Sequence, residues 1–212
     1  MTTARPAAVI FDFGGVLWNM RWDVCHHLEE AHGLARGAVF STLYRSDTWL
    51  AIERGAGDPL RWREEAHRAL EAGAGHALPP LHDAWRAQQS PIAENVALVR
   101  ALRRNYRLAI LSNADRTLRE RLSAGLPVHD LFDDIVCSAE VGMAKPEPGI
   151  YVLACGRLGL PPRACVFVDD HEPNVRAAEA CGISGVLYRV DRGDDLRAQL
   201  AAVGVTVDRE PE

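Results

Sequence analysis

The stretch VIFDFGGVLW (Val9–Trp18) decides the fold of this chain. An apolar run with β-branched residues ends on Asp12 and is followed by Phe13, Gly14 and Gly15. Continuous apolar runs of this kind are typical of strands that are buried on both faces of a parallel sheet. In such sheets, ligands bind beyond the carboxyl ends of the strands. The stretch therefore predicts an α/β fold with the Asp12 carboxylate at the ligand-binding edge.

Five apolar runs along the chain match this strand pattern. They are Ala7–Phe13, Leu108–Asn113, Asp134–Ser138, Cys165–Asp170 and Gly185–Val190. Two segments between them show helical spacing of apolar residues: Ile92, Val96, Val99 and Leu102, and Ile150, Leu153, Ala154 and Leu158. An alternation of strands and helices indicates parallel strand pairing. We therefore expect a three-layer, Rossmann-like core with a parallel sheet.

The segment 18–90 breaks this alternation. It contains tryptophans, histidines and helical charge patterning, but no convincing strand run. We interpret it as an inserted helical cap domain that follows the first strand, and we assign residues 1–17 and 91–212 to the core domain. At the far end of the insertion, Pro91 after Ser90 predicts a helix start, because proline is favoured at the first position of a helix.

The composition indicates a globular protein whose partners are small solutes. The chain has 212 residues, of which 48% are hydrophobic, and this is enough for one core and a small inserted domain. Its 24 basic and 29 acidic residues are spread along the chain, which argues against nucleic-acid binding and against a polybasic membrane segment. The amino-terminal apolar run is short and ends on an acid, so we expect neither signal peptide nor membrane span, and a cytoplasmic location. The sequence indicates no particular oligomeric state.

The five cysteines point away from two common structural roles. They are odd in number and lack CxxC spacing, which argues against a disulfide framework and a structural zinc site. We expect them to be small buried apolar residues.

Polar residues stand at the ends of the predicted strands. Asp12 ends the first run, Ser112 and Asn113 the second, and Asp169 and Asp170 the fourth. Taken singly, such residues are typical of turns and helix starts. Two adjacent carboxylates at a buried strand end repel each other, however, and a cation keeps both ionised. We therefore expect a cation site at this edge, to which the loop after the third run delivers Lys145.

Four motifs follow one another along the chain: FDFGGVL, LSN, KPEP and VFVDDHEPN. Together they resemble the haloacid dehalogenase-like (HAD) superfamily, in its branch with a helical cap after the first strand. The resemblance covers nearly the whole chain, although the cap carries no diagnostic motif. It implies a Mg²⁺-dependent phosphatase that hydrolyses a small phosphorylated metabolite, for example a sugar phosphate, through an aspartyl-phosphate intermediate on Asp12.

The resemblance also implies roles for individual residues. The catalytic residues are Asp12 as nucleophile, Ser112, Lys145 and Asp169. Substrate binding falls to Ser112, Asn113 and Lys145, together with the backbone amides after Asp12. The Mg²⁺ ligands are Asp12, the Gly14 carbonyl and Asp170, with Asp169 at a metal-bound water or in contact with the ligands. Asn174 orients the acidic loop or caps the following helix. Oxygen ligands without His or Cys favour Mg²⁺ over zinc.

Gly14 departs from the family pattern. Phosphatases of the family carry an acid at this position, which protonates the leaving group and later activates water, a contribution of about 10²–10⁴-fold. Three hypotheses follow. The substrate has an easily departing leaving group, such as an anomeric sugar phosphate or an acyl phosphate; another residue supplies the proton; or the chain is a catalytically weak metabolite-binding protein. The candidates for a replacement acid are Asp23, His26, His27 and His171.

A 2-haloacid dehalogenase-type hydrolase is the main enzymatic alternative. This reaction uses the same aspartate without a metal, and a cap arginine holds the substrate carboxylate. The candidate arginines are Arg21, Arg36 and Arg45. The carboxylate pair Asp169 and Asp170 argues against this alternative, because the dehalogenases of the family do not usually carry it.

Overall fold

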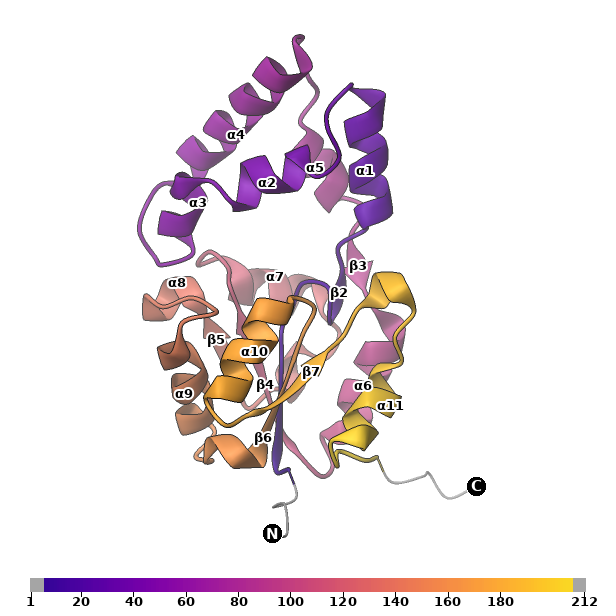
Figure 1. Ribbon diagram of the computed structural model, residues 1–212, viewed down its shortest axis with the longest axis vertical. Coiled ribbons are helices and arrows are strands. Elements are labelled where there is room, and N and C mark those ends of the chain that lie inside the picture. Colours follow the sequence, from indigo (N-terminus) through magenta and orange to yellow (C-terminus); the bar gives the residue numbers. More distant parts are fainter. Residues whose placement is uncertain (1–5, 208–212) are drawn as a thin grey trace.

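A five-stranded parallel sheet forms the centre of the computed structural model, which describes residues 6–207 (Figure 1). Its strands are β1 (Ala8–Phe11), β4 (Arg107–Ser112), β5 (Asp134–Cys137), β6 (Cys165–Asp169) and β7 (Ser184–Leu187), in the spatial order β5-β4-β1-β6-β7. The central strand β1 pairs in parallel with β4 on one side and β6 on the other, so that Ile10 lies opposite both Ala109 and Phe167. All five predicted strands and their parallel pairing are confirmed.

Helices cover both faces of this sheet. One face packs against α6 (Ala93–Leu102), α7 (Leu118–Gly125) and α11 (Leu196–Ala202), and the other against α9 (Pro148–Arg157) and α10 (Glu172–Ala180). Side chains alternate along a strand, and Val9 and Phe11 accordingly join one hydrophobic cluster whereas Ala8 and Ile10 join the other. The three-layer, Rossmann-like architecture is thereby confirmed. The short α8 (Ser138–Val141) and three 3₁₀ helices complete the described core: His129–Leu131, Pro162–Ala164 and Val190–Arg192.

The segment between β1 and β4 forms a separate helical unit, which we call the helical insertion (residues 18–90). It contains α1 (Trp22–Ala31), α2 (Ala38–Tyr44), α3 (Asp47–Ile52), α4 (Pro59–Ala74) and α5 (Leu81–Arg86). These helices enclose a hydrophobic cluster of their own around Trp49, Trp62 and Trp85. In Figure 1 the insertion lies above the end of the sheet at which β1 finishes, away from both termini.

A short antiparallel ribbon lies at the two ends of the helical insertion. It consists of β2 (Trp18–Asn19) and β3 (Ser90–Pro91), with Trp18 opposite Pro91. The prediction that Pro91 opens a helix is therefore wrong, because α6 begins two residues later and Ile92 donates its N–H to the carbonyl of Leu17 at 2.9 Å. The division of the chain into domains at these positions stays a prediction, and residues 1–5 and 208–212 of the predicted core lie outside the described residues.

Two further expectations concern the cysteines and the membrane. All five cysteines are free, four of them buried and Cys181 half-buried, in agreement with their predicted role as small apolar residues. Within residues 6–207, no helix combines the length and the hydropathy that crossing a membrane requires.

Candidate active site

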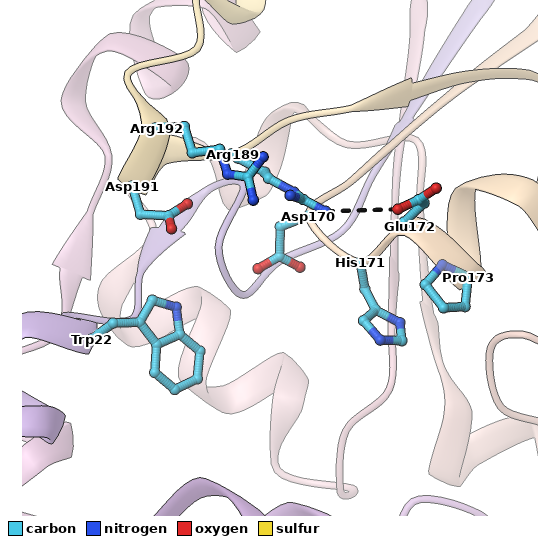
Figure 2. Close-up of a pocket in the computed structure, with 8 residues that line it drawn as sticks. All are labelled: Trp22, Asp170, His171, Glu172, Pro173, Arg189, Asp191 and Arg192. Atoms are coloured by element: carbon cyan, nitrogen blue, oxygen red, sulfur yellow. Dashed lines mark ion pairs between the residues drawn. The ribbon is translucent and has the colours of Figure 1, made fainter. Parts of the chain in front are cut away.

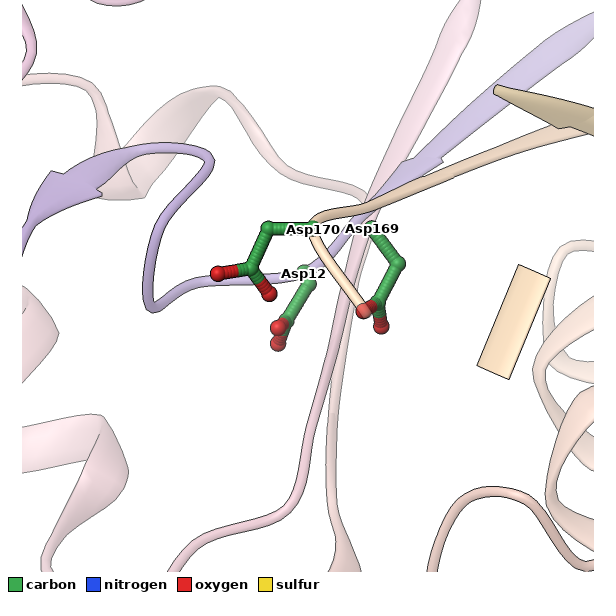
Figure 3. A group of neighbouring side chains, drawn as sticks. All are labelled: Asp12, Asp169 and Asp170. Carbon is green, nitrogen blue, oxygen red and sulfur yellow. The ribbon is translucent and has the colours of Figure 1, made fainter. Parts of the chain in front are cut away.

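Three carboxylates meet at the carboxyl edge of the central strands. Asp12 follows β1, Asp169 is the last residue of β6, and Asp170 comes next. Since β1 and β6 are neighbours in the sheet, their ends bring these side chains together, and one oxygen from each lies within 4.8 Å of the others (Figure 3). The expected gathering of acidic residues at this edge is therefore present, and these carboxylates form what we call the acidic cluster (Asp12, Asp169 and Asp170).

Lys145 inserts a single ammonium group into the acidic cluster. Its Nζ lies 2.9 Å from Oδ1 of Asp12 and 2.7 Å from Oδ2 of Asp169. The Lys145 side chain is 2% exposed. Burial lowers the pKa of this ammonium, but the two carboxylates outweigh burial, and the pKa lies above its usual value. The two carboxylates therefore favour the charged form of Lys145 at the site.

Asp169 has no exposed surface, and protein donors saturate its carboxylate. Its Oδ1 accepts the His171 N–H at 2.8 Å, and Oδ2 accepts the Lys145 ammonium. The Asn174 side-chain amide lies 3.2 and 3.1 Å from the two oxygens. These contacts fix the Asp169 side chain in one orientation and place Asn174 where it holds the acidic loop. Asp169 in turn positions Lys145 beside Asp12.

The other two carboxylates of the acidic cluster have pKa values above their usual range. Burial and, to a lesser extent, the proximity of Asp169 raise the pKa of Asp12 to about 6, although Lys145 opposes the shift. Burial, Asp12 and Asp169 raise the pKa of Asp170 to about 8. In the described part of the chain, no side chain donates a hydrogen bond to Asp170. Three carboxylates around one ammonium thus suit a further cation with a preference for oxygen ligands.

Ser112 and Asn113 extend the site from the end of β4. The Asn113 side chain donates from Nδ2 to the Lys145 carbonyl at 2.9 Å and accepts the Lys145 N–H on Oδ1 at 2.8 Å. The Asn113 amide therefore ties the loop of Lys145 to the end of β4. Ser112 is buried, and its hydroxyl is free to bond a ligand, since it bonds no other group among residues 6–207.

The glycine turn after Asp12 brings the backbone against the acidic cluster. Gly15 has a φ of +79°, and a Cβ atom there would lie 2.1 Å from Oδ2 of Asp170. The Phe13 N–H already donates to Oδ1 of Asp12 at 2.7 Å, and the Gly15 N–H donates to the Trp18 carbonyl at 2.8 Å. Two of the amides that were expected to bind phosphoryl oxygens therefore have acceptors within the chain. A Cβ at Gly14 would meet only the side chain of Met20.

The residues considered as proton donors in place of an acid at position 14 lie at different distances from the acidic cluster. Asp23 accepts two hydrogen bonds from the Arg21 guanidinium, which hold its pKa down at about 2, so it is a poor proton donor near neutral pH. His26 and His27 lie in α1 and make no described contact with the acidic cluster. His171 stands directly after Asp170 at the rim of a pocket.

This pocket has a volume of about 380 Å³ and opens beside Asp170 (Figure 2). The loop after β7 contributes Arg189 and Arg192, and the first residue of α1 contributes Trp22. Sequence reasoning missed these three residues. The position of Arg189 just after a strand could have pointed to the arginines, whereas nothing in the sequence aims Trp22 at the core. The remaining lining residues are His171, Glu172, Pro173 and Asp191.

The fold and the acidic cluster define a class: α/β proteins in which a half-buried aspartate directly follows the first strand. The family model "haloacid dehalogenase-like hydrolase" matches residues 6–182 of this chain. The chain belongs to that family.

Two curated relatives resemble part of the chain. Protein CbbY of Rhodobacter capsulatus is 36% identical over 104 residues, which make up 47% of this chain and 46% of that protein. N-acylneuraminate-9-phosphatase of Homo sapiens is 34% identical over 106 residues, or 49% of this chain and 42% of that protein. The matched segments thus span less than half the length of these relatives.

Solved structures align with most of the chain. A HAD family enzyme from Bacteroides thetaiotaomicron, described as a magnesium complex, has a TM-score of 0.69 at 25% identity and covers 91% of this chain and 97% of its own. An L-2-haloacid dehalogenase has a TM-score of 0.60 at 26% identity and covers 87% of this chain and 85% of its own.

Proposed function

We propose that this protein is a Mg²⁺-dependent phosphatase that hydrolyses a small phosphorylated metabolite through an aspartyl-phosphate on Asp12. One observation carries the proposal: the buried Lys145 ammonium lies 2.9 Å from Oδ1 of Asp12 and 2.7 Å from Oδ2 of Asp169, inside a cluster of three carboxylates. A nucleophilic carboxylate must approach a dianionic phosphoryl group, so its site needs fixed positive charge. The phosphatase name of one relative supports this assignment.

The first chemical step is attack by Asp12. Its Oδ1 is held by Lys145 and the Phe13 N–H, which leaves Oδ2 to attack phosphorus. A bond forms between Oδ2 and phosphorus while the bond from phosphorus to the leaving oxygen breaks. The Ser112 hydroxyl and the Lys145 ammonium bind phosphoryl oxygens during the transfer. Water then attacks phosphorus, which releases inorganic phosphate and restores the Asp12 carboxylate.

The residues at the acidic cluster fit a magnesium ion. Asp12, Asp170 and the Gly14 carbonyl would supply oxygen ligands, as Mg²⁺ prefers. Burial together with neighbouring carboxylates raises the pKa values of Asp12 and Asp170, a penalty on the ionised forms that a bound cation would offset. When bound, Mg²⁺ would offset the charge of the nucleophile and of the phosphoryl group. The HAD family enzyme of the same fold that is described as a magnesium complex supports this choice.

The helical insertion acts in this proposal as a cap domain over the site. Arg54, in the turn after α3, lies 2.6 Å from Oε1 of Glu147, which follows Lys145 by two residues. Gly55 is so close to the core that a Cβ there would lie 2.3 Å from the Ala139 carbonyl oxygen. Contacts of the cap with the loop of Lys145 support a role in excluding water and selecting the leaving group.

The glycine at position 14 favours substrates with a good leaving group. No acid follows Asp12 in the turn, and Asp23 is held ionised by Arg21. The leaving oxygen then takes its proton from water, which suits anomeric sugar phosphates, acyl phosphates and aryl phosphates.

Dehalogenation of a 2-haloacid is the second candidate, and the solved L-2-haloacid dehalogenase of the same fold favours it. The acidic cluster speaks for the phosphatase, because carboxylate displacement of halide requires no second or third carboxylate. Of the three arginines considered for the substrate carboxylate, Arg21 is already paired with Asp23.

The decisive experiment measures hydrolysis of 4-nitrophenyl phosphate with and without Mg²⁺, and halide release from 2-chloropropionate. We expect Mg²⁺-dependent phosphate release, reduced about 10⁴-fold or more in Asp12→Asn. The variant Asp130→Asn makes the same change at an exposed carboxylate that is not part of the acidic cluster. It is the matched control and should retain full activity. Halide release without metal would instead establish the dehalogenase. If the protein showed neither activity and formed no beryllium fluoride adduct at Asp12, it would be a metabolite-binding protein without catalysis.

A further inference from the structure

The pocket beside Asp170 joins the acidic cluster to the outside. Its lining comes from both parts of the chain, with Trp22 from the helical insertion and Arg189 and Arg192 from the core. Figure 2 shows the two arginine side chains extending from the loop after β7 toward Asp170, with Trp22 across from them. A volume of about 380 Å³ is at the small end of the range for ligand pockets and suits the leaving group of a small metabolite.

The two guanidinium groups in the lining of this pocket are weakly paired with its carboxylates. Among residues 6–207, Arg189 has one carboxylate partner, Glu172, at the long distance of 3.9 Å. Glu172 also forms an i,i+4 ion pair with Arg176, which is no lining residue. Arg192 forms no ion pair with any residue that the structure describes.

Only one carboxylate remains to oppose the two guanidinium groups. Asp170 belongs to the acidic cluster, where the proposed metal takes up its charge, and Glu172 is shared with Arg176. Asp191 is then left against Arg189 and Arg192. With the proposed metal bound at Asp170, the pocket would therefore present about one unpaired guanidinium to its ligand.

The loop that carries the arginines is held in place before any ligand arrives. The Arg189 N–H donates to Oδ2 of Asp194 at 2.8 Å, and Gln199 bonds the same oxygen at 3.2 Å. Gln199 also donates to the Leu187 carbonyl at the end of β7. On the opposite wall, Trp22 is fixed by Trp85, with ring centroids 5.2 Å apart. Such preorganisation reduces the entropy lost when a ligand binds.

From these contacts we infer that Arg189 and Arg192 bind a second anionic group of the substrate, a carboxylate or a second phosphate, while Trp22 covers the carbon skeleton between the two ends. Preferred substrates are then small phosphorylated acids or bisphosphates rather than neutral phosphate esters. Guanidinium groups suit both anions, because their forked donors match two oxygens at once. The inference rests on the proposed phosphatase function and adds the class of substrate.

A series of aryl phosphates tests it, because aryl leaving groups depart without a proton donor. The substrates are phenyl phosphate, 4-carboxyphenyl phosphate and 1,4-phenylene bisphosphate, with 4-(hydroxymethyl)phenyl phosphate as the neutral analogue, all in saturating Mg²⁺. The quantity measured is the ratio of kcat/KM for each anionic substrate to that for phenyl phosphate. The larger of the two anionic ratios identifies the group as carboxylate or phosphate.

We expect ratios above one in the wild type, and a fall of about tenfold in Arg189→Gln and in Arg192→Gln. Arg197→Gln changes an exposed arginine of α11 outside the pocket and should keep the wild-type ratio. A merely structural role for the two arginines lowers all kcat/KM values together and leaves the ratio unchanged, which overturns the inference. Unchanged ratios with hydrolysis of phenyl phosphate intact refute this inference alone, whereas no hydrolysis of any member refutes the phosphatase function as well.

Discussion

The backbone of Gly15 packs against the Asp170 carboxylate so closely that a Cβ atom at position 15 would lie 2.1 Å from Oδ2 of Asp170. The glycine turn thus leaves no room for a side chain beside the proposed metal ligand. Any side chain at position 15 must displace Asp170, and a φ of +79° adds backbone strain to the clash.

Gly15→Ala should therefore weaken Mg²⁺ binding and lower kcat/KM for an aryl phosphate by about 10²-fold. Gly33→Ala is the matched control, since Gly33 has a φ of +69° and a Cβ there would meet no atom within 4 Å. Both variants carry the left-handed strain, of about 1 kcal/mol, but only one moves a carboxylate. Calorimetric Mg²⁺ titration measures the difference. Equal affinities in the two variants would contradict a role for Asp170 as ligand.

Lys145 is the only lysine of the chain, since the other 23 of its 24 lysine and arginine residues are arginines. The gap between Asp12 and Asp169 accepts a compact ammonium, and a planar guanidinium has a different shape and reach. We expect Lys145→Arg to lower kcat by about 10²-fold or more. Arg157→Lys, at a half-exposed ion pair with Asp134, is the reciprocal control and should retain activity. A Lys145→Arg variant with wild-type kcat would show that charge alone suffices.

The Lys145 amine should also resist chemical modification. Its side chain is 2% exposed and its raised pKa keeps it protonated, whereas acylating reagents need a free amine. Treatment of the folded protein with an N-hydroxysuccinimide ester at about pH 8 should leave this position unmodified, and treatment after denaturation should modify it. Peptide mass spectrometry reads out both states. Rapid acylation in the folded protein would mean that the site opens readily.

Ser112 and Asn113 should separate into a ligand-binding and a positioning residue. Asn113→Ala removes both hydrogen bonds to the Lys145 backbone, so we expect a loss of about 1–2 kcal/mol in the free energy of unfolding and a lower kcat. Ser112→Ala removes a hydroxyl that bonds no described group, so KM for phosphate esters should rise at nearly unchanged stability. Urea denaturation and steady-state kinetics measure the two effects. If Asn113→Ala instead raised KM at unchanged stability, Asn113 would be a substrate contact, as the sequence predicted.

Gly14→Asp should restore the acid that the turn lacks. The new Cβ would meet the Met20 sulfur at 3.3 Å, the end of a flexible side chain that can move aside. We expect hydrolysis of an unactivated ester such as glycerol 3-phosphate to rise by about 10²-fold, and that of 4-nitrophenyl phosphate to change little. Gly14→Asn matches the size without the proton. No gain over Gly14→Asn would mean that another group already supplies the proton.

His82 should make the stability of the protein depend on pH. This buried imidazole contacts the Tyr44 hydroxyl at 3.2 Å, and desolvation lowers its pKa from 6.5 to about 4. The unfolded chain therefore takes up a proton as pH falls below 6.5 while the folded protein does not, so this stability is present above pH 6.5 and is lost as pH falls toward 4. The charged groups that act on His82 are Arg63, Asp83, Arg86 and Arg121.

Replacement of His82 by Gln should remove this dependence. Between about pH 7 and pH 4.5 the wild type should lose up to about 3 kcal/mol more than His82→Gln in the free energy of unfolding. His67→Gln, at a half-exposed histidine, is the control and should follow the wild type. Denaturant titrations across this pH range give the comparison, and parallel curves for wild type and His82→Gln would refute the assignment.

Much of the core was predictable because its signals are local in the sequence. The β-strand runs are continuous and apolar, and the rule that ligands bind at the carboxyl edge of a parallel sheet is enough to gather Asp12, Asp169 and Asp170. Lys145 could be placed at the same edge for the same reason. The roles of these residues in catalysis remain proposals, since position alone does not establish chemistry.

The rest depends on contacts between segments that are distant in the chain. The sequence around Asn113 does not predict that its side-chain amide bonds the backbone of Lys145, which is 32 residues away. Pro91 pairs with Trp18 in a short ribbon, and this pairing overrides the local preference of proline for the first position of a helix. Arg189 and Arg192 become neighbours of Trp22 only when the helical insertion lies over the core.

The ribbon of β2 and β3 has a consequence for how this fold can vary. Trp18 and Pro91, at the two ends of the helical insertion, are paired. Because the two ends of the insertion are adjacent, we expect that the five helices between them can be exchanged for others of different length or sequence while the sheet strands keep their spacing. New leaving groups could thus be admitted by grafting, while the aspartate after the first strand stays where it is.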